Sequence, residues 1–182
     1  MPQENSSTPS DDLLVKEIKN GDSDSFKKLY FKYFSHLIRF ALYRTHSMDI
    51  SREAVQELFS RIWIKRNLLN PEKPVKAYLY KSLNNLIINN KKLHSSRNIS
   101  LDELSRNIKD SGTGDPELKI DILNAISRLP EKIKSVYLLS RLEGLKYNEI
   151  AEICKISEKA VEKRMSKAMD ILRKIFSEKY FS

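Results

Sequence analysis

The sequence is poor in residues that cross-link, break or bend a chain. It contains one cysteine, Cys154, with four glycines and six prolines in 182 residues. A single cysteine cannot form a disulfide within the chain, so a disulfide-held fold is excluded and a reducing compartment is expected. Glycine and proline are scarce, and long segments rich in Leu, Ile, Lys and Glu show no alternating strand pattern. This composition favours an all-α protein.

Long apolar runs are also missing. No window approaches the roughly 18 consecutive apolar residues that a membrane-spanning helix needs. The N-terminal stretch "MPQENSSTPSDD" has neither a basic start nor an apolar segment. We therefore expect no signal peptide, no direct membrane insertion and a cytoplasmic location.

Residues that carry catalysis or hold metals are few and scattered. The histidines, His36, His46 and His94, are too far apart for a sequence-local metal site, and neither a glycine-rich phosphate loop nor an HExxH motif occurs. Cys154 falls on an apolar helix face, where a small core side chain is expected. We therefore expect no enzyme activity, no catalytic residue, no metal or cofactor, and no small-molecule substrate.

Positive charge is what the sequence has in excess. The formal net charge is +9 and the isoelectric point is about 9.5, which indicates an anionic partner, most commonly nucleic acid, with a membrane surface as the alternative. Residues 61–100 hold nine Lys or Arg against the single acid Glu72, a net charge of +8. Residues 101–127 hold six acids and three bases, and they include "DSGTGDP". That stretch is typical of a solvated linker.

Apolar residues recur every three or four positions in the first half of the chain, as amphipathic helices require. The expected helices cover residues 11–20, 23–44, 51–66 and 75–92. Gly21 is predicted to stop the first helix in a left-handed conformation, and Ser51 is a candidate N-cap for the third. In the fourth helix, Tyr78 is expected to face inward and Asn84 outward.

A second helical unit is predicted from about residue 119. Its first helix, "IDILNAISRL", ends at Pro130, which can begin the next helix, "PEKIKSVYLLSRLEG". The following stretch, "EGLKYNEIAEICKISEKAVEKRM", contains two short amphipathic helices separated by "CKIS". The small residue Ala151 lets these helices cross closely. The spacing is that of a DNA-binding helix-turn-helix, although many helical hairpins also satisfy it.

Taken together, these segments resemble a bacterial RNA polymerase sigma factor of the extracytoplasmic-function (ECF) group of the sigma-70 family. The stretch "LPEKIKSVYLLSRLEGLKYNEIAEICKISEKAVEKRMSKAMDILR" is similar to that family's C-terminal promoter-reading domain, and "REAVQELFSRIW" with "KAYLYKSLNNLIINN" to its N-terminal domain. "YLYKSLNNLIINN" and "LLSRLEGLKYNEIA" are similar to the FecI-like branch common in Bacteroidetes. The sequence departs from the family pattern at Lys155, where Gly is usual, at Lys146, where a Ser or Thr cap is usual, and at Ala160, where Thr is frequent.

The resemblance implies an all-α fold of two small helical domains joined by a flexible linker, the C-terminal one a helix-turn-helix. Residues 1–10 would be a disordered tail and 95–118 the linker. Residues 11–94 would form the region 2 domain, which binds core RNA polymerase and recognises and melts the −10 element, and 119–182 the region 4 domain, which recognises the −35 element. Core polymerase, promoter DNA and an anti-sigma factor are the implied partners. The alternative is a stand-alone helix-turn-helix regulator, which would need a ligand, receiver or dimerisation domain in place of 11–94.

The resemblance also implies three groups of binding residues; for each residue, an ordinary solvated surface is the alternative. Candidates for holding the opened −10 strand are Arg61, Lys65, Arg66, Asn67, Asn70, Lys81, Asn85, Lys91 and Lys92. On the recognition helix, the candidates are the cap Ser157, the base-reading Lys159, Glu162, Lys163 and Ser166, and the backbone-binding Arg164 and Lys167. The polar face of Glu53, Gln56 and Glu57 corresponds to the family surface that docks on the coiled coil of the largest catalytic polymerase subunit.

Overall fold

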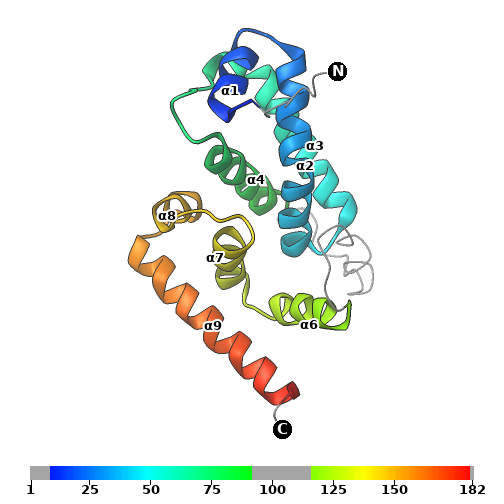
Figure 1. Ribbon diagram of the computed structural model, residues 1–182, viewed down its shortest axis with the longest axis vertical. Helices are drawn as coiled ribbons and strands as arrows, with labels where there is room; N and C mark the ends of the chain where they lie inside the picture. The colour runs from blue at the N-terminus through cyan, green and yellow to red at the C-terminus, as the bar shows by residue number, and fades with distance from the viewer. Residues whose placement is uncertain (1–8, 92–115, 181–182) are drawn as a thin grey trace, which may run out of the picture.

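The computed structural model describes residues 9–91 and 116–180, and every regular element in these ranges is a helix. The elements are α1 (Asp11–Lys19), α2 (Ser23–Thr45), α3 (Met48–Ile64), the 3-10 helix η1 (Arg66–Leu68), α4 (Val75–Lys91), α6 (Pro116–Ser127), α7 (Glu131–Arg141), α8 (Tyr147–Cys154) and α9 (Glu158–Tyr180) (Figure 1). The all-α prediction is confirmed. The candidate Lys92 and most of the expected linker, up to residue 115, lie outside the described residues.

The N-terminal unit consists of α1 to α4 packed around one apolar core. The long helix α2 buries the predicted stripe of Leu29, Leu37 and Phe40, and it packs against both α3 and α4. Phe40 also meets the buried ring of Tyr80 from α4 edge to face, with the ring centroids 5.3 Å apart. Burial of this stripe fixes which faces of α3 and α4 remain outside for function.

The ends of these helices follow from local hydrogen bonds. Gly21 adopts the predicted left-handed conformation, with a φ of 94°. Glycine suits this position because a residue with a side chain rarely adopts that conformation. The third helix starts earlier than expected, at Met48, where Ser47 Oγ accepts a hydrogen bond from the Ile50 N–H at 3.3 Å. The prediction of Ser51 as the cap is therefore wrong. Ser51 is fully buried inside α3, and its hydroxyl donates to the Ser47 carbonyl.

Two predictions for the faces of α4 are wrong. Tyr78 is 41% exposed and Tyr80 is the buried tyrosine, while Asn84, expected outside, is only 5% exposed. The pattern assumed one buried face, but α4 contacts α2 and α3 on one side and α8 of the C-terminal unit on another. Because α8 covers Asn84, this polar side chain, which was expected on the surface, is buried.

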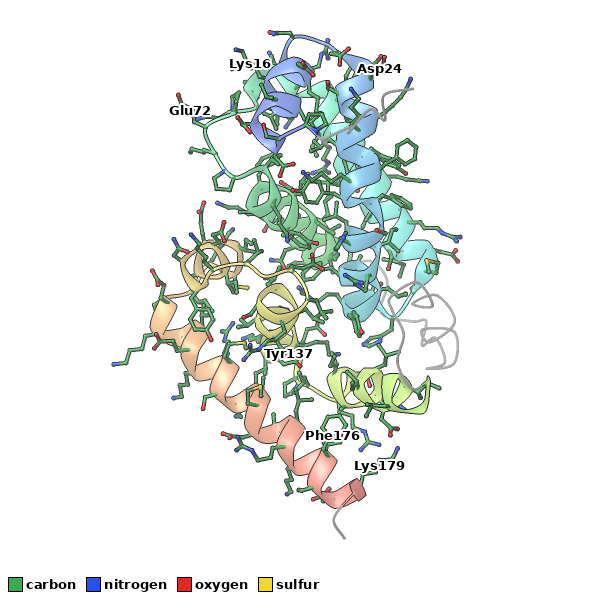
Figure 2. The ribbon with its side chains drawn as sticks, viewed as in Figure 1. Lys16, Asp24, Glu72, Tyr137, Phe176 and Lys179 are labelled. Carbon is green, nitrogen blue, oxygen red and sulfur yellow. The ribbon has the colours of Figure 1, made fainter. Side chains whose placement is uncertain are left out.

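The C-terminal unit consists of α6 to α9. Helix α7 begins at Glu131, one position after the predicted start, with Pro130 as its N-cap residue, and α6 begins at Pro116. Helix α9 runs for 23 residues, so only its first half belongs to the helix-turn-helix. Its second half packs on α6, where Phe176 joins a small apolar cluster and Lys179 forms an ion pair with Asp121 (Figure 2). This packing supports the recognition helix beyond the helix-turn-helix.

The two units lie against one another. Helix α4 contacts α8, and α2 contacts α7, so that α7 and α8 lie between the N-terminal unit and the long helix α9 (Figure 1). One apolar cluster continues through both units, from Leu83 of α4 to Ile153 of α8 and Met165 of α9. Helix α1 and the C-terminal end of α9 lie at opposite ends of the molecule (Figure 1).

Candidate nucleic-acid interface

The helix-turn-helix is formed by α8 and α9, and local hydrogen bonds accommodate its unusual residues. At Lys146, which has no capping side chain, the backbone N–H donates to the Glu149 carboxylate at 2.8 Å. Lys155 adopts the left-handed conformation, with a φ of 55°, and so takes the role in which glycine is common. Ser157 accepts a hydrogen bond from the Ala160 N–H at 3.2 Å and caps α9 as predicted.

The first half of α9 presents a charged outer face. Val161 and Met165 are buried against the rest of the unit, which fixes the rotation of the helix. The predicted base-reading residues on the opposite side are all exposed, namely Lys159, Glu162, Lys163 and Ser166. Of the two predicted backbone-binding residues, Lys167 is exposed and Arg164 is half-buried. A groove of about 480 Å³ between the start of α7 and α9 is lined by four cationic side chains, Lys132, Lys163, Arg164 and Lys167. The structure therefore brings the candidate phosphate and base contacts of this helix together.

A second cavity lies at the loop between η1 and α4. Asn70 shapes this loop, because its Oδ1 accepts a hydrogen bond from the Glu72 N–H at 2.9 Å. The cavity, of about 450 Å³, is lined on the N-terminal side by Asn70, Lys73, Tyr78 and Lys81, among others, and on the α8 side by Asn148, Glu149, Glu152 and Ile153. The sequence predicted Asn70 and Lys81. It gave no signal for Lys73 and Tyr78, because a loop lysine and an assumed core tyrosine carried no distinguishing pattern.

The remaining −10 candidates are spread over several elements. Arg66 donates to the Trp63 carbonyl at 3.0 Å and its guanidinium lies 4.8 Å from the centre of the Trp63 ring. Lys65 and Asn67 are exposed beside it, and Asn85 is half-buried on α4. Lys91 is the last residue of α4, and its side chain lies outside the described residues. The structure therefore groups Lys65, Arg66 and Asn67 near η1, apart from the cavity at Asn70.

The polar face of α3 is present as predicted. Glu53 and Gln56 are exposed, on the side of the helix opposite to buried Val55 and Leu58. Glu57 forms an ion pair with Arg61 one turn further along. Arg61 thus belongs to the same surface as the α3 acids, although its charge was assigned to the −10 strand.

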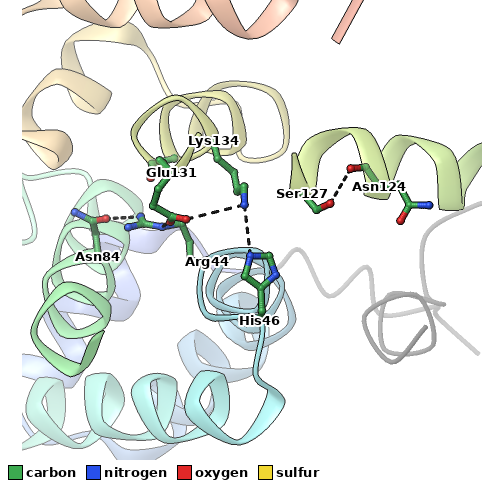
Figure 3. Close-up of polar contacts among 8 residues, drawn as sticks. Arg44, His46, Asn84, Asn124, Ser127, Glu131 and Lys134 are labelled. Atoms are coloured by element: carbon green, nitrogen blue, oxygen red, sulfur yellow. Dashed lines mark hydrogen bonds and ion pairs between the residues drawn. The ribbon is translucent and has the colours of Figure 1, made fainter. Parts of the chain in front are cut away.

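A polar network between the two units was not predicted. Arg44, at the end of α2, donates to Glu131 of α7 and to Asn84 Oδ1 of α4, the latter at 2.6 Å (Figure 3). Lys134 Nζ of α7 lies 3.5 Å from His46 Nε2, just beyond α2. An arginine in the apolar run "FALYRT" was the one available signal, because a buried cation requires partners.

Electrostatics at this contact favour the charged form of Glu152 on α8. The hydrogen bond from Lys81, together with its charge, lowers the pKa of Glu152. Burial, followed by the negative charge of Glu143, raises the pKa of Tyr80 well above its usual range, so its phenol stays protonated. Burial also raises the pKa of Tyr43 to about 12.

Family comparisons match both units, in order. The family described as sigma-70 region 2 matches residues 29–97, and the family described as sigma-70, region 4 matches residues 119–172. The RNA polymerase sigma factor SigV of Bacillus subtilis is 28% identical over 165 residues, covering 88% of this chain and 89% of that protein. The ECF RNA polymerase sigma-E factor of Haemophilus influenzae is 25% identical over 176 residues, covering 89% and 93%. The chain belongs to the sigma-70 family, in its ECF group.

Solved structures of sigma factors share the fold of this ECF factor. CnrH, solved in complex with the cytosolic domain of CnrY, has a TM-score of 0.72 at 20% identity, with 92% of this chain and 97% of that chain covered. The sigma factor RpoE of Bartonella quintana, solved with the anti-sigma factor NepR, has a TM-score of 0.70 at 19% identity, with 84% and 96% covered. Within residues 9–91 and 116–180 of this sigma factor, no helix is long and apolar enough to cross a membrane. The same described part contains no cluster of three His, Cys, Asp or Glu able to hold a metal ion.

Proposed function

We propose that this ECF sigma factor binds core RNA polymerase in the cytoplasm and directs it to specific promoters, itself acting as an initiation factor without catalysis. The observation that carries the proposal is the occurrence of both regions, in order, each with its expected surface exposed. Region 2 presents the α3 polar face and region 4 presents the outer face of α9. Promoter-specific initiation requires both surfaces in one chain, one to attach to polymerase and one to read DNA.

Each surface has a chemistry suited to its task. The cationic outer face of α9 and the groove beside it fit the major groove and flanking phosphates of the −35 duplex. The basic segment of 61–92, with amides at Asn67 and Asn70, fits an opened −10 strand, whose phosphates need cations and whose unstacked base needs hydrogen-bond partners. The acids and glutamine of α3 fit a polymerase surface with complementary charge.

We further propose that an anti-sigma factor regulates this chain. We also propose that the chain belongs to the FecI-like branch of the ECF group. A sigma factor of the same fold, the Bartonella quintana RpoE, was solved with the anti-sigma factor NepR. The segments "YLYKSLNNLIINN" and "LLSRLEGLKYNEIA" support the branch.

The deciding experiment combines purified chain with core RNA polymerase. We expect co-elution in size-exclusion chromatography and, in the presence of a promoter library, transcripts that start at specific sequences. A stand-alone regulator gives the opposite pattern, namely duplex DNA binding without polymerase and no initiation. That result would replace the sigma-factor assignment.

Base capture at the η1–α4 loop is tested by replacing Asn67 and Asn70 with Ala. We expect impaired promoter opening at matched duplex occupancy, because the opened base loses its amide partners. Permanganate reactivity of thymines in the melted region measures this. Asn70→Ser is the control, since serine supplies an uncharged side-chain acceptor for the Glu72 N–H. If promoter opening is normal in the Asn70→Ser variant, Asn70 shapes the loop and does not bind the base.

A further inference from the structure

A groove on the C-terminal unit joins the recognition helix to a helix outside the helix-turn-helix. It has a volume of about 480 Å³ and lies between the start of α7 and the first half of α9. Helix α9 lines it with Ala160, Lys163, Arg164 and Lys167, which recur every three or four residues along one side of the helix. Two helical turns separate the first of these residues from the last, so the groove follows α9 for about 10 Å.

The opposite wall of the groove comes from the first turn of α7. Glu131, Lys132 and Ile133 line it, next to Pro130. Lys132 is exposed. The helix-turn-helix pattern starts only at α8, so that pattern carries no signal for Lys132. The structure alone places this lysine across from the recognition helix.

The positive charge of this groove is uncompensated. Its four cationic side chains are Lys132, Lys163, Arg164 and Lys167. Within residues 9–91 and 116–180, none of them forms an ion pair with a carboxylate. By contrast, Lys179 at the far end of α9 pairs with Asp121. A concentration of unpaired cations in one groove favours an anionic occupant.

The one acid that lines the groove is engaged from behind. Glu131 forms an ion pair with the buried Arg44, and its carboxylate lies 4.0 Å from the Lys134 ammonium group (Figure 3). The charge of Glu131 is therefore offset by cations that do not line the groove. It does not cancel the charge of Lys132 or Arg164.

The floor of the groove is apolar. Ile133 is nearly buried there, between Pro130 and Ala160. Apolar surface bordered by cations fits a sugar–phosphate backbone, in which deoxyribose carbons alternate with phosphates. A free inorganic phosphate has no apolar part to cover this floor. The lining thus favours a stretch of DNA backbone as the occupant.

We propose that Lys132 of α7 clamps one DNA backbone phosphate together with Arg164 and Lys167 of α9, at the edge of the major groove that α9 reads. This inference rests on the proposed function, because it takes the outer face of α9 as the surface that reads the −35 duplex. Lys132 is then a positioning residue, since it contacts no base. A phosphate held between two helices fixes how α9 sits in the major groove, and so how Lys163 meets a base edge.

The test measures duplex binding by the full chain, alone and in complex with core polymerase. The variants are Lys132→Ala, Lys132→Arg and the control Lys174→Ala. Lys174 is an exposed lysine on the second half of α9, outside the groove. One duplex is enriched from a random library by the wild-type chain, and the other has an unrelated sequence. Each phosphate of the enriched duplex is replaced in turn by an uncharged methylphosphonate, and fluorescence anisotropy gives the affinities at several salt concentrations.

At about 0.1 M salt, we expect Lys132→Ala to lower the affinity for both duplexes by the same factor, about five- to tenfold. The salt slope should fall by about one, because one phosphate contact is lost. Lys132→Arg keeps the charge and should bind nearly as tightly as the wild type, and Lys174→Ala should match the wild type.

The methylphosphonate series identifies the clamped phosphate. At one position, removal of the charge should weaken binding of the wild type but change binding of Lys132→Ala little, because the partner of that phosphate is already missing. A residue that only supports the fold would produce no such position. Circular dichroism verifies that each variant keeps its helices.

Three results overturn the inference. In the first, Lys132→Ala binds as Lys174→Ala does, or every methylphosphonate weakens it as much as the wild type, so Lys132 holds no phosphate. In the second, Lys132→Ala weakens binding to the enriched duplex alone, so Lys132 reads sequence. In the third, the wild type binds neither duplex, alone or with core polymerase. Failure of the proposed function looks different, since duplex binding then depends on Lys132 as expected while core polymerase never associates.

Discussion

Lys163 and Lys167 lie one helical turn apart on the exposed side of α9, yet they are expected to contribute differently. A good bidentate contact to a base edge discriminates by about 1–3 kcal/mol, whereas a phosphate contact carries no sequence information. Lys163→Ala should therefore relax the preference among −35 variants. Lys167→Ala should weaken binding to all variants about equally and reduce the salt slope by about one.

Binding across a promoter library at several salt concentrations measures both effects together. If Lys163→Ala lowers every affinity by the same factor, or if neither substitution matters, this face of α9 is only a solvated surface.

The thiol of Cys154 gives a prediction about pH. Burial raises the pKa of Cys154, partly opposed by the positive charges of Arg44 and Arg164. Because the thiolate is the reactive form, the native chain at about pH 8 should react with iodoacetamide more slowly than the urea-unfolded chain. The pKa contribution to this difference should shrink as the pH rises through the raised pKa, where the native thiol also ionises. Mass spectrometry over a pH series measures the two rates, and equal rates at pH 8 would contradict the burial of this group.

At the scale of the element, α3 shows how one helix is divided between core and function. Its buried residues recur at helical spacing, as the amphipathic pattern of 51–66 predicts, and its outer face keeps Glu53 and Glu57 available. We expect Glu53→Lys with Glu57→Lys to weaken binding to core polymerase at least about tenfold, because like charges then meet across the interface. A binding titration measures the affinity, and circular dichroism verifies the helix content.

The matched control for this pair is Asp170→Lys with Glu178→Lys on α9. It makes the same change in charge. It disrupts two intrahelical ion pairs, at Asp170 and Glu178, where the α3 variant disrupts one, at Glu57. Unchanged polymerase affinity of the α3 variant, or an equal loss in the α9 variant, would refute the assignment of this face.

The ends of helices were predicted correctly from the sequence where they depend on residues within one turn. Gly21 and Ser157 were identified because a left-handed stop and a side-chain cap involve only residues within one turn. Ser51 was misassigned because its hydroxyl donates to Ser47 inside the helix, and a serine at either position looks equally suited to a cap. The sequence preference does not show which of two nearby serines the fold will bury.

At the scale of the whole molecule, Asn84 links the two units. It holds Arg44 in place and donates to the Ile153 carbonyl, so removing its amide leaves a buried cation with fewer partners. Asn84→Ala should lower the free energy of unfolding by about 1–3 kcal/mol. Urea denaturation followed by circular dichroism measures this loss. Asn89→Ala on the exposed side of the same helix is the control, and equal stability of the two variants would show that the network contributes nothing.

The sequence by itself determined the helices and the helix-turn-helix pattern, which follow from periodicity and caps, properties of residues close together along the chain. The three groups of candidate binding residues came from the resemblance of the sequence to the family. Only the tertiary structure decided that α8 covers α4, that Arg44 bonds to Glu131 87 positions away, and that Lys81 bonds to Glu152 71 positions away. Two amphipathic units can pack in many relative orientations with similar apolar burial, so the orientation is set by which distant charges meet. Such a pairing leaves no periodic signal in either segment.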